Sequence, residues 1–268
     1  MLKIKKLALS CALLIGFGAG SVQAEDCGEV SLTEMDWGSA IIVTQVAKFL
    51  LEQGYGCSVT VVPSASVPAL ASVSETGEPD IITELWTNGA PAYVPLLEAG
   101  KINELTRVLS DGGLEGLFIP VYLAEAHPEL TTIEGVLANP DLVGNRMHNC
   151  PVGWNCQTVA TNVAKGGGFE AAGIEDFVHG SGETLTASIG AAYASKEPWF
   201  GYYWTPSLVM GKYPMVQVDL GPHDPSKQAC NSDKDCANPT MQSWPSSVVT
   251  TVVTSEFEAS HPAETDLM

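Results

Sequence analysis

Two cysteines and a tryptophan form the most distinctive short motif of the chain. The stretch from Asn149 to Cys156 is Asn-Cys-Pro-Val-Gly-Trp-Asn-Cys, so Trp154 lies between cysteines six residues apart. If Cys150 and Cys156 are joined, the closed loop presents the indole ring at a constrained angle. The backbone N–H groups of Asn155 and Cys156 then lie beside that ring. This combination is typical of a ligand-binding loop.

Two further tryptophans end strand-like runs, and each is followed by a threonine. Trp86 follows the apolar run at 81–85, and Trp204 follows the aromatic run at 199–203. A quaternary ammonium group has no N–H donor, so a protein cannot recognise it through hydrogen bonds from the ligand. The electron-rich faces of indole rings do attract such a weakly hydrated cation. Trp86, Trp154 and Trp204 therefore predict an aromatic box for an onium group.

A fourth tryptophan, Trp37, ends another expected strand. It could contact the ligand or belong to the core, and the sequence leaves both roles open.

Signals for catalysis are weak by comparison with these binding motifs. The five histidines are spread among loops without a carboxylate or nucleophile at recognisable spacing, and the nucleophile-elbow motif Gly-x-Ser-x-Gly is missing. We therefore expect a binding protein and not an enzyme.

The first 24 residues have the pattern of a cleaved secretory signal peptide. Three lysines precede an apolar run at 7–18, and Val22-Gln23-Ala24 supplies small residues at the cleavage site. We expect export to the periplasm and no membrane insertion after cleavage. Loss of the three lysines changes the formal net charge from −19 to −22. A chain with this much negative charge is repelled by nucleic acid and by anionic membrane surfaces, so we expect neither as a partner.

Six cysteines remain after cleavage, an even number that favours disulfides in an exported protein. The six-residue spacings favour the local pairs Cys150–Cys156 and Cys230–Cys236, which leaves Cys27 with Cys57, although sequence alone allows about 15 connectivities. A zinc site lacks paired Cys-x-x-Cys motifs or a histidine cluster. Residues 231–242 imitate a calcium loop but lack its glycine and its final glutamate. We expect no metal and no cofactor.

Strands and helices alternate along the chain, which indicates an α/β fold. A helix expected at 39–53 has an apolar stripe of Ile42, Val46, Phe49 and Leu50 that should face the core, and Gly54 should end its last turn. We expect the other strands and helices at 30–35, 57–62, 81–85, 90–99, 131–138, 157–166, 181–196, 199–203, 215–220 and 248–254.

Three local patterns add detail to this outline. Residues 116–122 contain Pro120, which suits a strand that passes between two lobes better than one in the middle of a sheet. Thr131 and Glu134 fit a capping box for a short helix. From Ser255 the chain has the start of a helix without a stop signal, so we expect the sequence to be a fragment that lacks its last helices.

The motifs together resemble one known family. Cys-Pro-Val-Gly-Trp-Asn-Cys at 150–156, Pro-Trp-Phe-Gly-Tyr-Tyr-Trp-Thr-Pro at 198–206 and Glu-Leu-Trp-Thr at 84–87 are similar to the periplasmic glycine betaine/proline betaine binding proteins of ABC transporters. The resemblance covers nearly all of residues 25–268. Family members continue well past the position of Met268, which agrees with the expected truncation.

The resemblance implies a type II periplasmic-binding-protein fold, in which two α/β lobes with mixed sheets are joined by a two-strand hinge and close on the ligand. The first lobe would comprise residues 25–116 and a return segment at 222–268, and the second residues 117–221. The trimethylammonium box would consist of Trp86, Trp154 and Trp204. The amides of Asn155 and Cys156 would hold the ligand carboxylate.

One position departs from the family. A histidine four residues after the first box tryptophan helps to hold the carboxylate in the family, and this chain has Ala90 there. His148, Arg146 and Ser39 are candidate replacements, and Trp37 and Tyr203 are further candidate ligand contacts.

Several ligands and roles stay open. Glycine betaine, proline betaine, choline, carnitine and a sulfonium analogue are all compatible with the box; the alternatives are taurine, an amino acid, or a sensing module of the same fold. The resemblance also implies an ABC permease as partner and a monomer in solution.

Overall fold

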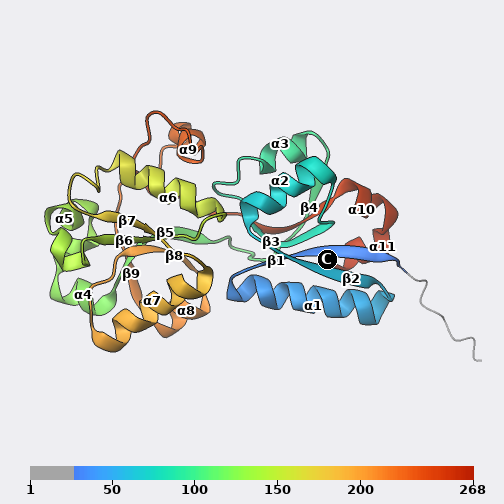
Figure 1. Ribbon diagram of the computed structural model, residues 1–268, viewed down its shortest axis with the longest axis horizontal. Coiled ribbons are helices and arrows are strands. Elements are labelled where there is room, and N and C mark those ends of the chain that lie inside the picture. Colours follow the sequence, from blue (N-terminus) through green and yellow to red (C-terminus); the bar gives the residue numbers. More distant parts are fainter. Residues whose placement is uncertain (1–26) are drawn as a thin grey trace, which may run out of the picture.

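Two five-stranded sheets, one in each lobe, organise residues 27–268, the part of the chain that this computed structural model describes (Figure 1). The predicted signal peptide lies outside the described residues. The strand order is β2-β1-β3-β10-β4 in the first sheet and β7-β6-β8-β5-β9 in the second. Both sheets mix parallel and antiparallel pairs. The predicted α/β fold with two mixed sheets is confirmed.

The first lobe contains the N-terminal half of the fold and the C-terminal segment. Its elements are β1 (Glu29–Met35), α1 (Gly38–Tyr55), β2 (Ser58–Ser64), α2 (Ser66–Thr76), β3 (Ile81–Trp86), α3 (Tyr93–Glu98), β4 (Ile102–Arg107), β10 (Val249–Thr254), α10 (Ser255–Ser260) and α11 (Pro262–Leu267). In Figure 1, α1 lies along one face of the first sheet, and α2 and α3 lie on the other.

Helix α1 packs on its sheet through small and polar residues, so the predicted core-facing stripe is wrong. Its buried positions are Ala40, Thr44, Ala47 and Leu51, while Ile42 is 66% and Phe49 61% exposed. The other two stripe residues, Val46 and Leu50, are exposed as well. Small side chains let the helix lie close to the sheet, and the Thr44 hydroxyl is satisfied there by Thr33 O and Thr83 Oγ1. The helix also ends at Gly56, which has a positive φ, and not at Gly54.

The second lobe contains the remaining elements. They are β5 (Leu114–Pro120), α4 (Val121–Ala126), η1 (Pro128–Thr131), α5 (Ile133–Ala138), η2 (Pro140–Val143), β6 (Arg146–Asn149), α6 (Asn155–Gly166), β7 (Glu175–Val178), α7 (Gly182–Ser195), β8 (Gly201–Thr205), α8 (Leu208–Lys212), β9 (Met215–Gln217) and α9 (Pro225–Asn231). The predicted helix at 181–196 is confirmed closely: Ser181 caps α7, and Lys196 closes it in a left-handed conformation.

Strand β5 lies inside the second sheet, which corrects the prediction of a strand between lobes. It pairs with β8 on one side and β9 on the other. Pro120 is the last residue of β5, so its missing N–H removes a hydrogen-bond donor only at the end of the strand. Helix α4 begins at the next residue, Val121.

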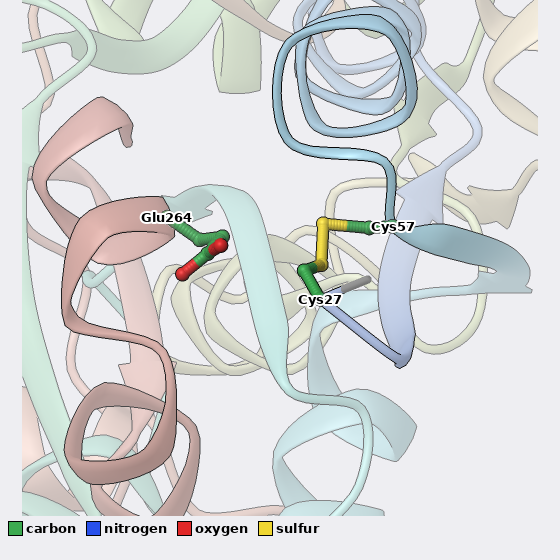
Figure 2. Close-up of side chains that lie close together, drawn as sticks. All are labelled: Cys27, Cys57 and Glu264. Atoms are coloured by element: carbon green, nitrogen blue, oxygen red, sulfur yellow. A yellow bond between two sulfur atoms is a disulfide. The ribbon is translucent and has the colours of Figure 1, made fainter. Parts of the chain in front are cut away.

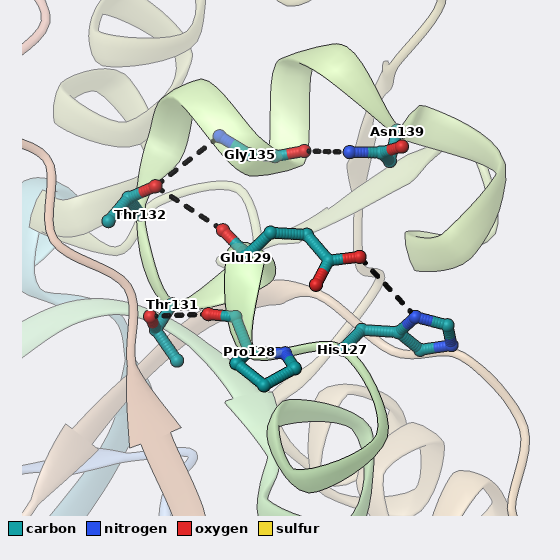
Figure 3. A network of polar contacts seen from close by, with 7 residues as sticks. All are labelled: His127, Pro128, Glu129, Thr131, Thr132, Gly135 and Asn139. Carbon is teal, nitrogen blue, oxygen red and sulfur yellow. Dashed lines mark hydrogen bonds and ion pairs between the residues drawn. The ribbon is translucent and has the colours of Figure 1, made fainter.

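The cap of α5 also differs from the prediction by one residue. The Thr132 hydroxyl accepts the amide N–H of Gly135, whereas the Thr131 hydroxyl donates to Pro128 O in the preceding turn (Figure 3). Because the 3₁₀ turn η1 includes Thr131, the extended backbone that an N-cap needs is first available at Thr132.

The structure contains the three disulfides that the cysteine spacing favours, namely Cys27–Cys57, Cys150–Cys156 and Cys230–Cys236. The first links the start of β1 to the start of β2, with Glu264 of α11 close by (Figure 2). Because both sulfur atoms are in the disulfide, they offer no thiolate to a metal ion. A single carboxylate remains, so this group carries no metal site.

Two segments cross between the lobes, one at 108–113, which begins with a turn, and an extended one at 244–248. Gly113 and Ser247 exchange two backbone hydrogen bonds, with N···O distances of 2.8 and 2.7 Å.

The predicted lobe boundaries stay predictions. The Asn162 amide donates to Asn231 O and Asp233 O, which holds α9 and its cystine loop on α6 of the second lobe. We therefore propose to place the return to the first lobe near residue 244 instead of 222.

None of the helices within residues 27–268 has both the length and the apolarity to cross a membrane.

The crossing segment leaves no room for a side chain at Gly113. A Cβ built there would lie 2.1 Å from Cζ3 of Trp86. We expect Gly113→Ala to displace the indole and to lower the free energy of unfolding by about 1–3 kcal/mol. Chemical denaturation and tryptophan fluorescence would measure this. Gly54→Ala is the matched control, because its Cβ meets open space; equal effects of the two substitutions would contradict the prediction.

Candidate functional site

Four tryptophans from four separate regions of the chain surround a cavity between the lobes. Together with space that is open to solvent it contains about 310 Å³ free of atoms, and about 30 Å³ is available to the centre of a water molecule. Its lining residues are Trp37, Ser66 and Trp86 of the first lobe and Glu115, Trp154, Asn155, Cys156, Tyr202 and Trp204 of the second. The structure therefore brings together the three tryptophans that sequence predicted for a box, together with Trp37, the further candidate ligand contact.

A buried carboxylate orients the two tryptophans of the first lobe. Glu84 Oε1 accepts hydrogen bonds from Trp37 Nε1 at 2.7 Å, Trp86 Nε1 at 3.0 Å and Ser39 Oγ at 2.9 Å. Glu84 is 2% exposed, and its Oε2 has no hydrogen-bond partner. Side chains alternate along a strand, so Glu84 and Trp86 of β3 project from the same face. The carboxylate fixes both indole planes and removes their N–H groups from the cavity.

Trp154 is oriented in the same manner from across the cleft. It is the N-cap of α6 and lies within the loop closed by Cys150–Cys156. Its Nε1 donates to Oδ1 of Asp36 at 2.6 Å. Trp154 meets Trp37 with ring centroids 5.1 Å apart and planes at 70°. The disulfide and the carboxylate together fix both ends of this side chain.

Trp204 completes the wall from the second sheet. Its ring centroid lies 5.6 Å from Trp154 and 6.2 Å from Trp86, with planes at 69° and 72°. Tyr203 stacks on it at 4.3 Å, and the Tyr203 hydroxyl bonds with Thr186. Planes at such angles form adjacent walls and not a stack.

Glu115 is a wall residue that the sequence analysis missed. It lies opposite Trp204 in the β5–β8 pair and is 3% exposed. Oε1 accepts from the Tyr202 hydroxyl at 2.7 Å, and Oε2 from Asn88 Nδ2 at 3.0 Å. Burial raises the pKa of this carboxyl to about 7, against the lowering effect of hydrogen bonds from Tyr202, Asn88 and Ser247. The signal that could have revealed it in the sequence is the single acidic residue within the otherwise apolar run after Leu114.

Asn155 links the lobes and presents an acceptor beside the cavity. Its Nδ2 donates to Trp86 O at 2.7 Å, and its buried Oδ1 has no hydrogen-bond partner. Asn155 and Cys156 are the first two residues of α6, where backbone N–H groups lack partners within the helix. The structure thus places these predicted residues at the wall, next to Trp154.

The candidate replacements for the family's histidine lie elsewhere. His148 bonds with His179 at 2.9 Å and stacks on Trp199. Burial, then the neighbouring His179 and Arg146, lower the pKa of His148 to about 4, so it is neutral at pH 7. Arg146 pairs with Glu175 on the surface. Neither residue lines the cavity, because β6 carries both side chains to a different part of the second lobe. Their predicted role as carboxylate anchors stays a prediction without support from this geometry.

Ser39, Tyr203 and Ala90 also lie outside the wall. Ser39 binds Glu84 behind Trp37, and Tyr203 lies behind Trp204. Both residues support tryptophans and do not line the cavity itself. Ala90 is buried. Within residues 27–268, no lysine, arginine or histidine lines the cavity.

Asp36 connects the lobes on one side of the cavity. Besides accepting from Trp154, its Oδ2 accepts the amide N–H of Gly182, the first residue of α7, at 3.2 Å. Val67 N also donates to Gly153 O across the cleft at 3.0 Å. A carboxylate at a helix N-terminus is favoured by the helix dipole. The lobes are therefore in contact, in a closed arrangement.

Removing the charge of Asp36 should weaken this closure. In Asp36→Asn the amide NH₂ replaces one acceptor, so either Trp154 or Gly182 loses its partner. We expect a more open protein, with a larger radius of gyration in small-angle X-ray scattering. Asp80→Asn is the control, because Asp80 bonds only within the first lobe, to Ser31. An unchanged scattering profile for Asp36→Asn would show that the contact does not hold the lobes together.

The raised pKa of Glu115 predicts a pH-dependent stability. Between about pH 4.5 and pH 7 folded Glu115 keeps a proton that the unfolded chain releases, so its contribution to stability falls as the pH rises through this window and then levels off. The lowered pKa of His148 makes the opposite contribution between about pH 4 and pH 6.5, so the effect of Glu115 is the difference in slope between the wild type and a variant without this carboxyl. We expect Glu115→Gln to remove the Glu115 contribution and to stabilise the ligand-free protein at pH 8 by about 3 kcal/mol. Urea unfolding at several pH values measures it. An identical slope in the variant and the wild type would refute the assignment.

Comparisons with known proteins agree with this architecture. The family model "Substrate binding domain of ABC-type glycine betaine transport system" (OpuAC) matches residues 28–268. No significant match was found among curated proteins.

Solved structures of three binding proteins share the fold. A choline-binding ABC-transporter protein in complex with choline aligns with a TM-score of 0.69 and 18% identity, over 90% of this chain and 76% of that one. A glycine betaine/L-proline-binding protein from Borrelia burgdorferi aligns with a TM-score of 0.68 and 18% identity, over 86% and 77%. Lactococcal OpuAC with glycine betaine aligns with a TM-score of 0.64 and 17% identity, over 88% and 80%.

The similar structures establish the fold of a two-lobed binding protein, and the family model adds the class. The chain belongs to the family of substrate-binding domains of ABC-type glycine betaine transport systems.

Proposed function

We propose that this protein captures a small quaternary ammonium solute in the aromatic cavity and delivers it to the permease of an ABC importer. The tryptophans Trp37, Trp86, Trp154 and Trp204 would enclose the methylated onium group. Tyr202, Glu115 and Asn155 would contact the rest of the ligand. Closure of the lobes would exclude water and release of the ligand would follow at the permease.

The observation that carries this proposal is the orientation of the indoles. Trp37, Trp86 and Trp154 direct their N–H groups to carboxylates, so they offer ring faces and not donors to the cavity. A hydrogen-bonding ligand such as an amino acid needs donors and acceptors from the wall. An onium group needs electron-rich surfaces, each worth about 0.5–2 kcal/mol when water is excluded.

Two of the similar structures support the same ligand class, because their descriptions name choline and glycine betaine as bound ligands of those proteins. An acidic sulfonate or amino acid would bring a negative charge into the cavity. No basic side chain of residues 27–268 lines that cavity. Taurine and amino acids also carry an ammonium group whose N–H donors need acceptors that indole faces do not offer, so they fit less well than onium compounds. A sulfonium solute shares the charge and the methyl groups, and belongs to the same class.

The remaining parts of the proposal follow from the family and the disulfides. Three disulfides suit an oxidising compartment outside the cytoplasm, which agrees with the predicted periplasmic location. We propose that the protein acts as a monomer, binds its ligand without changing it chemically, and meets the permease through the outer surfaces of the closed lobes.

Substitutions at Trp204 test the role of the ring faces. Trp204→Phe keeps an aromatic face, whereas Trp204→Leu keeps an apolar wall without one. For an onium ligand we expect a loss of affinity of a few-fold for phenylalanine and at least about tenfold for leucine, measured by isothermal titration calorimetry. A thermal-shift screen against betaines, choline, carnitine and sulfonium solutes would first select the ligand.

The control is a substitution at Trp199, which is buried in the second lobe beside His148 and does not line the cavity. Trp199→Phe should leave affinity unchanged. Equal affinities of the phenylalanine and leucine variants of Trp204 would exclude a cation–π contribution from that ring. Stabilisation by none of the onium compounds would refute the proposed function.

A further inference from the structure

Glu115 is the acidic group in the cavity wall, and no cationic side chain among residues 27–268 neutralises it. The ion pairs among residues 27–268 join Lys48–Glu52, His127–Glu129, Arg146–Glu175 and Lys234–Asp235, all of them elsewhere. The donors that Glu115 has instead are neutral, with Tyr202 on Oε1 and Asn88 on Oε2. A buried carboxylate with neutral donors alone is poorly compensated. A cationic ligand in the cavity would supply the missing charge.

Building on the proposed function, we propose that Glu115 is the counter-charge of the ligand and makes this cavity select a net-cationic quaternary ammonium compound, of the choline type, over a zwitterionic betaine. A choline-type ligand brings one positive charge and a hydroxyl donor. A betaine also brings a carboxylate, which must enter the same closed space as Glu115. The like charges repel each other there more strongly than in water.

The other polar groups of the wall point to the same choice. Asn155 Oδ1 lacks a partner and can accept a hydrogen bond from a ligand hydroxyl, but not from a carboxylate. Ala90 stands where the family resemblance implies a histidine for the ligand carboxylate, and it offers no hydrogen bond from its side chain. The backbone N–H groups at the start of α6 are the donors that remain for an anion.

The neighbours of Glu115 make its charge depend on the ligand. Tyr202 of β8 is the titratable group that faces it, and burial followed by Glu115 itself raises the pKa of Tyr202 well above 10, so it stays neutral. Asn88, Ser247, Gln217 and Trp204 face it from the other adjoining segments and carry no charge. The carboxylates of Glu84 and Asp36, in the first lobe, accept hydrogen bonds from the wall indoles.

Proton release should therefore accompany binding. Because burial raises the pKa of Glu115 to about 7 in the free protein, the carboxyl is largely protonated below neutral pH. A bound cation favours the ionised form, so it lowers this pKa and displaces the proton. Affinity for the cation then rises with pH up to about pH 7 and levels off above it.

Calorimetry with two probes, choline chloride and glycine betaine, tests the proposal from pH 5.5 to pH 8 in buffers of different ionisation enthalpy. For the wild type we expect the dissociation constant of choline to fall by about tenfold per pH unit below pH 7, with release of close to one proton. Glycine betaine should bind at least about tenfold more weakly than choline at pH 7.5.

Glu115→Gln should weaken choline binding at least tenfold at pH 7.5, remove its pH dependence and narrow or reverse the preference over glycine betaine. The Tyr202 hydroxyl can rotate to accept from the new amide, so folding should persist. Glu104→Gln is the matched control: Glu104 of β4 accepts from the Tyr93 hydroxyl at 2.8 Å but lies outside the cavity wall. It should bind both probes as the wild type does.

The outcomes separate this proposal from the function on which it rests. Preference of the wild type for glycine betaine over choline, or choline binding without pH dependence, would overturn the role of Glu115 and leave the quaternary ammonium function intact. These wild-type readouts do not depend on the folding of any variant. Binding of neither probe, nor of any other onium compound, would overturn both.

Discussion

Hydrogen bonds from indole N–H groups to carboxylates are the interaction on which the cavity depends. Glu84 holds Trp37 and Trp86, and Asp36 holds Trp154. Each such bond is charge-assisted and therefore stronger than one between neutral groups. It also sets the rotation of the ring and occupies the N–H group with a carboxylate oxygen. An indole that donates to an anion keeps a more electron-rich face, which improves its attraction for a cation.

The same interaction connects ligand recognition to lobe closure. Asp36 belongs to the first lobe, yet its two oxygens bind Trp154 and the N-terminus of α7 in the second. Gly182 permits this contact, because a Cβ there would lie 2.6 Å from Asp36 O and 2.9 Å from Cζ2 of Trp154. The complete aromatic wall therefore exists only when the lobes meet. Binding energy gained at the wall is available to stabilise the closed form.

Sequence predicted the α/β class, most strands, the cysteine pairs and three of the cavity tryptophans. Those features leave local signals: alternation, spacing, and aromatic residues at strand ends. Prediction from sequence failed where the packing or hydrogen-bond partner of a residue lies far away in the chain. The stripe around Ile42 and Phe49 looked like a buried face, but the sheet accepts Ala40 and Ala47 because close packing there favours small residues. Similarly, nothing local distinguishes a glutamate that orients indoles from one on the surface.

Glu84 and Glu115 show how one residue type serves two purposes in one cavity. Both are buried in strands, and neither has a cationic partner within the described residues. Three donors, two of them indoles, converge on one oxygen of Glu84, so its charge is used behind the rings to hold them. Glu115 accepts hydrogen bonds from neutral donors, Tyr202 on one oxygen and Asn88 on the other, and borders the cavity directly. Its charge is therefore the one that a ligand meets. An aromatic box alone recognises any methylated onium group, whereas a carboxylate in its wall also responds to the charge on the rest of the molecule.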